Sequence, residues 1–220
     1  MQRVKVLVIP ILLHIGALLP LIILAWDYAQ GQLTANPIRE IQLRTGRYTL
    51  VLLMLSLACT PIYNFTNFRL ALRLRRPLGL YAFMYSCLHL LNFIGLDYGF
   101  DFSLLWEDIA EKRYIVAGFA AFLILLTLAV TSIKGWVKRL GGNWARLHRL
   151  IYAAGILVVL HYLWQVKVDF RAPLVYAVIV VLLLLLRIPI VGRKAAERLK
   201  WQSRARPHKS AAVLSKKKDL

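Results

Sequence analysis

The chain has 220 residues, of which 60% are hydrophobic, and its formal net charge is +19. Soluble domains are typically about 45–50% apolar, and a small globule has too little interior to bury much more than that. The composition therefore excludes a disordered, collagen-like or disulfide-stabilised chain and indicates an integral membrane protein. The two cysteines, Cys59 and Cys87, are too few for a disulfide framework or a cysteine-rich metal site.

Charged residues fall in clusters, and six long uncharged runs separate these clusters. The runs cover residues 6–26, 48–68, 77–96, 114–133, 150–166 and 172–186. A helix needs about 20 apolar residues to cross the hydrocarbon core of a membrane, and the first four runs have that length. The sixth run is short but continues past Arg187, whose side chain can extend to the lipid head groups. We therefore expect an all-α integral membrane protein, a bundle of six transmembrane helices, with the last helix over 172–191.

The basic residues are unequally divided between the two ends of such a bundle. With both termini on one side, as six spans require, that side holds 22 basic and 2 acidic residues. The other side holds 7 basic and 8 acidic residues, so the two faces carry +20 and −1. Because lysine and arginine are enriched in cytoplasmic loops, we expect both termini to be cytoplasmic.

The same bias accounts for the strongly basic composition. No nucleic-acid-binding motif accompanies the charge, so we expect no nucleic-acid partner; the basic face is suited to anionic lipid head groups instead. We expect one transmembrane domain over 1–192, followed by a basic cytoplasmic tail over 193–220 that is partly disordered.

The histidines are the strongest candidates in the chain for a functional site. They are His14, His89, His148, His161 and His208. All but His208, which falls in the tail, lie in or beside apolar runs, where an ionisable side chain is costly. His89 lies 12 residues beyond Pro77, at the start of the third run, and His161 lies 12 residues beyond Arg149. The helical rise therefore places both about 18 Å from the cytoplasmic ends of their helices.

Two parallel helices would thus present imidazoles at one depth, in the outer half of the membrane. That arrangement can hold a heme iron from both sides, whereas a zinc ion would need further nitrogen or sulfur ligands. Each histidine taken alone has an alternative, a structural hydrogen bond to a neighbouring helix. Aromatic residues near the pair suit a flat cofactor, although aromatics are also common in membrane helices. They are Phe83, Tyr85, Phe93, Tyr152, Tyr162 and Trp164.

The first outer segment carries three arginines on the face that is otherwise not basic. They are Arg39, Arg44 and Arg47. Arginine binds carboxylates in a bidentate fork, so any of the three is a candidate for holding heme propionates. An amphipathic surface helix explains the same pattern, and the sequence leaves both interpretations open.

His148 has no histidine at the matching depth on the third helix. It lies 13 residues before His161, roughly 20 Å nearer the cytoplasm. It is either a ligand of a second, inner cofactor, a contact for a flavin or quinone, or a structural cap. His14, in the first run, is expected to be a core residue.

Six segments in order resemble the MsrQ family, the heme-binding membrane subunit of the bacterial periplasmic methionine sulfoxide reductase system, within the ferric-reductase-like transmembrane group. They read NPIREIQLRTGRY (36–48), LACTP (57–61), RRPLGLYAFMYSCLH (75–89), EDIAEKRYIVAG (107–118), LAVTS (128–132) and NWARLHRLIY…LHYLW (143–164). The ordered set is more specific than any one segment.

The resemblance implies b-type heme held by His89 and His161, with His148 as a further family histidine. It also implies an FMN cofactor, a location in the bacterial inner membrane, and a periplasmic molybdopterin-containing partner that reduces methionine sulfoxide in proteins. The residues themselves add that a bis-histidine iron has no open coordination site and should pass electrons.

We therefore expect an electron-transfer subunit with no catalytic residues of its own. Quinol or a cytoplasmic flavoprotein would be the donor, since the tail is too short for a nucleotide-binding domain. The alternative is a stand-alone ferric or quinone reductase of the same heme b architecture.

Overall fold

The computed structural model describes residues 2–187, and this part of the chain is helical without β-strands. The elements are α1 (Gln2–Ala29), α2 (Pro37–Thr66), α3 (Arg69–Leu91), the π-helix η1 (Asn92–Asp97), α4 (Phe102–Glu111), α5 (Arg113–Val130), α6 (Lys134–Leu140), α7 (Gly142–Leu147), α8 (Leu150–Gln165) and α9 (Arg171–Arg187). The expected basic tail lies outside the described residues.

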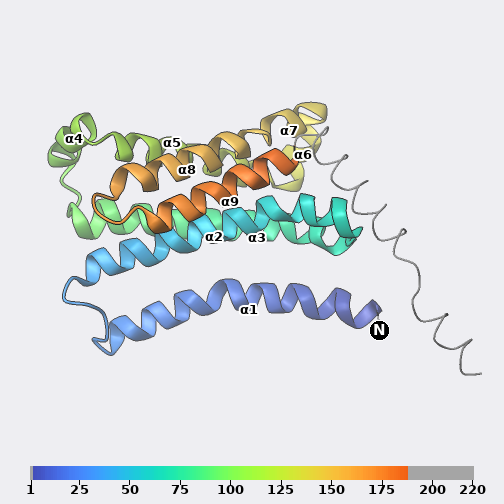
Figure 1. Cartoon of the computed structure of the whole chain (residues 1–220), viewed down its shortest axis with the longest axis horizontal. Coiled ribbons are helices and arrows are strands. Elements are labelled where there is room, and N and C mark those ends of the chain that lie inside the picture. Colours follow the sequence, from blue (N-terminus) through green and yellow to red (C-terminus); the bar gives the residue numbers. More distant parts are fainter. Residues whose placement is uncertain (1, 188–220) are drawn as a thin grey trace, which may run out of the picture.

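The long helices run side by side along the longest axis of the molecule (Figure 1). α2 packs along α3, α5 packs along α8, and α9 contacts both α2 and α8. α1 lies at one side of the bundle, against α2 and α3. The start of α1, α6, α7 and the end of α9 are at one end of the bundle, and α4 is at the other.

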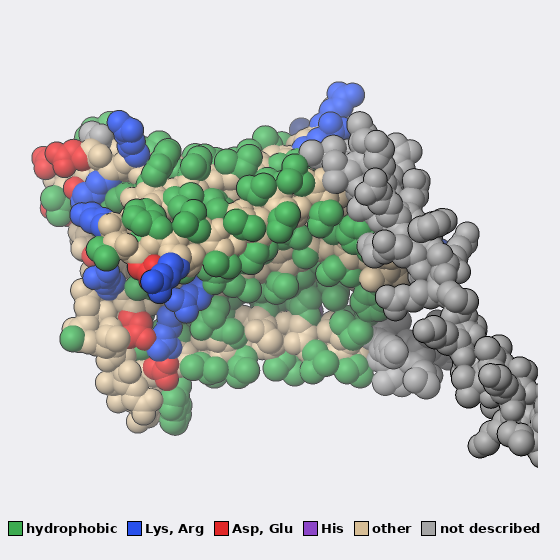
Figure 2. Space-filling model, viewed as in Figure 1, with side chains coloured by type: hydrophobic (Ala, Val, Ile, Leu, Met, Phe, Trp, Pro, Cys, Tyr) green, Lys and Arg blue, Asp and Glu red, His purple; other side chains and the backbone are tan. Residues whose placement is uncertain are grey.

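Five helical segments are long and apolar enough to cross a membrane. They are Val8–Ala29, Pro37–Thr66, Arg69–Asp97, Arg113–Val130 and Gly142–Gln165. α9 has 17 described residues, and its apolar sequence continues into 188–191, which lie outside the described residues. Hydrophobic side chains cover the middle of the molecule, and many charged groups gather at the end near α4 (Figure 2). Such an apolar surface is stable when lipid covers it.

α2 begins well before the run that predicted it. Its first residue is Pro37 rather than residue 48, so the outer segment with the three arginines is helical. The Asn36 side chain caps this end by accepting a hydrogen bond from the Arg39 amide at 3.0 Å, and proline is favourable in the first turn because its missing N–H is not needed there. α3 likewise begins at Arg69 and contains Pro77, which the sequence placed at the helix start.

Arg187 does not extend toward the lipid head groups as its sequence position suggests. Pro61 lies inside α2 and has no N–H, so the carbonyl of Leu57, four residues earlier, lacks its helical donor. The Arg187 guanidinium turns inward and donates to that carbonyl at 3.1 Å and to the Thr60 hydroxyl at 3.1 Å. Its charge also lies over the Tyr152 ring, 5.6 Å from the centroid. These contacts tie the end of α9 to the middle of α2.

The most deeply buried side chains are at the α2–α3 contact. Leu53, Leu57, Ala82 and Tyr85 have no exposed surface. The Tyr85 hydroxyl donates to the Ala17 carbonyl at 2.7 Å and so joins α3 to α1. Because lipid is as apolar as leucine, close packing and interhelical hydrogen bonds of this kind hold membrane helices together.

Candidate cofactor site

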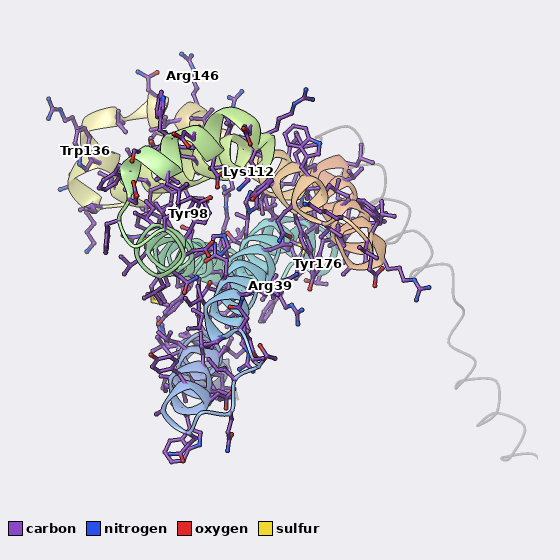
Figure 3. The ribbon with its side chains drawn as sticks, turned by 90° about the vertical axis from the view of Figure 1, so that its left-hand side faces the viewer. Arg39, Tyr98, Lys112, Trp136, Arg146 and Tyr176 are labelled. Carbon is purple, nitrogen blue, oxygen red and sulfur yellow. The ribbon has the colours of Figure 1, made fainter. Side chains whose placement is uncertain are left out.

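A cavity of about 810 Å³ lies among α2, α3, α4, α5 and α8, toward the end of the bundle that carries α4. Cofactor and ligand pockets are typically about 300–1,000 Å³ and are mainly apolar with a few polar groups. Figure 3 looks onto this end of the molecule, and two of the residues that it labels, Arg39 and Tyr176, line the cavity. The cavity therefore has the size and lining of a cofactor site.

The structure brings His89 and His161 together in the wall of this cavity. The first ring comes from α3 and the second from α8, and their centroids are 6.0 Å apart with the planes at 83°. The two histidines, which the sequence places at one depth, thus lie next to each other in the structure. Their positions in the sequence could not have shown which faces of the two helices point inward.

Each imidazole has one nitrogen fixed by a backbone carbonyl of a neighbouring helix. Nδ1 of His161 donates to the Tyr114 carbonyl of α5 at 2.7 Å. Nδ1 of His89 donates to the Gln42 carbonyl of α2 at 3.0 Å. A carbonyl can only accept, so the proton is on Nδ1 in both rings and Nε2 carries the lone pair. This tautomer is the one that a metal-binding histidine adopts when its second nitrogen is oriented by the protein.

A glycine lies four residues after each of these carbonyls. A Cβ on Gly46 would be 2.9 Å from Cε1 of His89, and a Cβ on Gly118 would be 2.6 Å from Nδ1 of His161. A helical side chain covers the turn that precedes it, so any residue with a Cβ would cover the carbonyl that the imidazole needs. α2 and α5 therefore share one arrangement, in which a glycine at position i+4 leaves the backbone carbonyl at position i accessible to an imidazole.

Of the three arginines of the outer segment, two line the cavity. Arg39 and Arg47 do so together with Gln42, as residues three and eight positions apart along a helix lie near one face. Arg44 does not line the cavity and donates to Asp27 and Glu40, both at 2.5 Å. Arg39 and Arg47 are thus available to an anionic group in the cavity, whereas Arg44 ties α2 to the end of α1.

The chain changes from α-helix to π-helix directly after His89. η1 starts at Asn92, which is only 4% exposed. The Asn92 amide nitrogen donates to the Gln42 side-chain oxygen at 2.6 Å and to the Ile38 carbonyl at 3.2 Å. π-helical turns are rare and are frequent at functional sites. Here the wider turn points an amide toward α2 beside the histidine.

α4 is an amphipathic helix at the open end of the cavity. Phe102 and Trp106 contribute to the cavity wall and are also strongly exposed. Asp108 belongs to α4, and its carboxylate accepts hydrogen bonds from the Tyr98 hydroxyl and the Lys112 ammonium. These bonds, that of Lys112 first, hold the pKa of Asp108 below its usual value. Burial and the bond to Asp108 raise the pKa of Tyr98, so at neutral pH the tyrosine is protonated and the aspartate is charged.

The other two histidines in the described part of the chain, His148 and His14, do not line this cavity. His148 follows α7 at the opposite end of the bundle, stacked on Trp144 with ring centroids 4.0 Å apart, and its Nε2 is 3.2 Å from the Thr131 hydroxyl. His14 was expected to be a core residue, but it is exposed on α1, where it forms a 2.8 Å hydrogen bond with the Tyr81 hydroxyl. Within the described residues, no group of three or more histidine, cysteine or acidic side chains is placed to hold a metal ion.

Sequence reasoning missed Gln42, Asn92, Gly46 and Gly118. The sequence did carry a signal for the two glycines, because a lone glycine inside a helix is unfavourable and indicates close packing. The polar pair had no comparable signal, since the segment with Gln42 was interpreted as a loop or a surface helix. Of the aromatic residues noted near the pair, Phe93 and Tyr162 line the cavity, whereas Tyr85 belongs to the α2–α3 core.

The fold and the site are those of a helical membrane protein with two imidazoles facing one cavity. The comparisons with known proteins agree with a protein of this class. Residues 45–159 match the family described as the ferric reductase like transmembrane component. The chain is 46% identical over 190 residues to the protein-methionine-sulfoxide reductase heme-binding subunit MsrQ of Rhodospirillum rubrum, covering 86% of this chain and 91% of that protein. It is 45% identical over 179 residues to the protein of the same name from Xanthomonas axonopodis pv. citri, covering 79% and 82%. The chain belongs to the MsrQ family.

Proposed function

We propose that this chain binds heme b between His89 and His161 and serves as the electron-transfer subunit of a protein-methionine-sulfoxide reductase system. One observation carries the proposal. Both rings face one cavity with centroids 6.0 Å apart, and both donate Nδ1–H to a backbone carbonyl. Metal–imidazole bonds of about 2.0–2.1 Å on the two sides of one ion give a centroid separation of roughly the same size.

The lining of the cavity suits the remainder of a heme. Apolar and aromatic side chains such as Phe93 and Phe122 offer contact area for a macrocycle. Arg39 and Arg47 are placed to pair with its propionates, because a guanidinium binds a carboxylate through two parallel hydrogen bonds. Arg44 is not part of this proposal, since it already pairs with two carboxylates.

His89 and His161 would hold the iron with no position left for substrate, so the bound group would supply one-electron transfer. The residues of the chain then hold the imidazoles in one tautomer and keep water from the cofactor. Catalysis of sulfoxide reduction belongs to a separate subunit, which we propose to be a periplasmic molybdopterin protein. The relatives are named as the heme-binding subunit of a protein-methionine-sulfoxide reductase.

We further propose six transmembrane helices in a bacterial inner membrane, within a domain over 1–192 that is followed by a cytoplasmic tail. α9 supplies the sixth span, and it finishes at the same end of the bundle as the start of α1. The positive-inside bias assigns that end, which also carries α6 and α7, to the cytoplasm. The cavity and α4 then face the periplasm, where the partner docks.

Electrons must enter from the cytoplasmic half, and quinol or a cytoplasmic flavoprotein is the proposed donor. His148 lies in that half and stacks on Trp144, so we propose it as a contact of a second carrier, an FMN, a quinone or an inner heme. A carrier there would shorten the distance between the donor and the outer site.

The test is a reduced-minus-oxidised absorbance spectrum of the detergent-purified protein, with heme quantified per chain. We expect sharp low-spin b-type bands, and we expect His89→Ala and His161→Ala each to abolish them. His14→Ala is the matched control, because its partner is Tyr81 outside the cavity. Normal bands in both ligand variants would refute the assignment. Electron transfer to a co-purified molybdopterin subunit would distinguish this function from that of a stand-alone ferric or quinone reductase.

A further inference from the structure

Gln42 contacts both nitrogen atoms of the His89 ring. Its backbone carbonyl accepts the Nδ1–H bond at 3.0 Å. Its side-chain nitrogen Nε2 lies 3.1 Å from Nε2 of His89, the nitrogen proposed to bind iron. The residue also lines the cavity. His161 has only the first of these contacts among the described residues, so the two imidazoles are not held alike.

The direction of the second contact follows from Asn92. The Asn92 amide donates to Oε1 of Gln42 at 2.6 Å, which leaves the Gln42 amide nitrogen to face His89 as a donor. The Nδ1 proton of His89 is already given to a carbonyl, so its Nε2 is the acceptor. A lone pair of His89 therefore receives an N–H bond from Gln42.

Asn92 is itself fixed from several sides. It begins the π-helix, is 4% exposed, and donates to the Ile38 carbonyl as well as to Gln42. Its own side-chain oxygen is buried without a hydrogen-bond partner among the described residues. A buried polar group left unpaired is unfavourable, so the surrounding packing and the two donated bonds hold this amide in place. The hydrogen bonds that link Asn92 to Gln42 and Gln42 to His89 consequently have a defined direction.

We propose that Gln42 is a positioning residue that sets how tightly His89 binds the heme iron. The inference rests on the proposed heme function. One lone pair serves one partner at a time, so iron coordination at Nε2 requires the Gln42 amide to rotate away and give up its hydrogen bond. Gln42 thus keeps the ring in the binding tautomer and at the same time weakens the heme affinity of the site.

The test compares hemin titrations of the full-length chain, purified in detergent after growth under heme limitation. Gln42→Leu removes the amide and leaves an apolar side chain one atom shorter, so we expect hemin to bind roughly three- to tenfold more tightly, the range that one interhelical hydrogen bond supports. Gln42→Glu has no donor, and its carboxylate favours an N–H at Nε2 of His89, the nitrogen proposed to bind iron, so we expect binding at least tenfold weaker. Gln30→Leu is the matched control, because Gln30 is exposed just after α1 and does not line the cavity; it should bind hemin as the wild type does.

Nitrogen NMR of labelled histidine in the heme-free chain gives a second readout, in which Gln42→Leu should shift the Nε2 resonance of His89, because its hydrogen bond is lost, while the proton stays on Nδ1. Unchanged or weaker hemin binding by a folded Gln42→Leu would overturn the proposal. If that variant does not fold, Gln42→Met replaces it under the same expectation. Absence of hemin binding by the wild type would refute the proposed function itself, which is a separate result from unaltered affinity in the Gln42 variants.

Discussion

Gly118→Ala is the most informative single substitution that the structure suggests. The added Cβ would lie 2.6 Å from Nδ1 and 2.8 Å from Cε1 of His161. That is about 1 Å inside ordinary van der Waals separation. The methyl group belongs to a rigid helix, so the imidazole must move, and its 2.7 Å bond to the Tyr114 carbonyl is then lost.

Two effects of opposite sign allow the magnitude to be stated. Replacing glycine by alanine inside a helix stabilises the helix by up to about 1 kcal/mol, and overpacking costs about 1–3 kcal/mol. The heme-free protein should therefore lose about 0–3 kcal/mol of stability. Loss of the hydrogen bond that orients a metal-binding histidine typically weakens metal affinity by roughly 10–100-fold, and we expect hemin affinity to fall by that factor.

Hemin titration and thermal unfolding of the same detergent-purified preparation measure both effects. Gly155→Ala is the matched control on α8, because its Cβ would meet Val180 and Leu57 at the ordinary distances of 3.5 and 3.6 Å. It should keep normal hemin affinity and gain slightly in stability. A Gly118→Ala protein with wild-type affinity would show that the close approach of α5 to His161 does not matter for the site.

Two further predictions concern the ends of the bundle. His148→Ala should retain the heme of the outer cavity but slow its reduction from the cytoplasmic side in reconstituted vesicles, and an unaltered rate would remove His148 from the electron pathway. Asp108 has a lowered pKa because Lys112 and Tyr98 donate to it, so its stabilising contribution is present above the usual aspartate pKa of about 3.9 and is lost as the pH falls through the lowered value. Tryptophan fluorescence in acid, with Trp106→Phe as the blank for α4, should therefore show a transition in the wild type that Asp108→Asn lacks; the same transition in both proteins would contradict this explanation.

The sequence predicted the helical membrane class because lipid imposes a simple requirement on every span. The apolar run that contains His161 coincides with α8 almost to the residue, since such a helix needs no information beyond hydrophobicity and length. The run that contains Tyr48 did not show where α2 begins, because charged residues continue the helix beyond the apolar part. The same limitation applied to α3, where Pro77 does not interrupt the helix.

The paired histidines were accessible from the sequence for a geometric reason. Depth along a helix is proportional to residue number, so His89 and His161 could be placed at one level before any packing was known. The resemblance to the MsrQ family supported the same pair independently. What they bind remains a proposal, but their proximity is a property of the fold.

The sequence by itself thus determined the class of protein, the approximate place of its long apolar helices and the depth of its key side chains, because these depend on composition and on the fixed rise of a helix. Only the tertiary structure decided which faces meet. It separated Arg39 and Arg47 from Arg44 by the rotation of α2. It also brought the Gln42 carbonyl, opened by Gly46, to the ring of His89. Rotation about a helix axis and contact between helices far apart in the chain depend on the packing of the whole bundle, and no local pattern of residues specifies them.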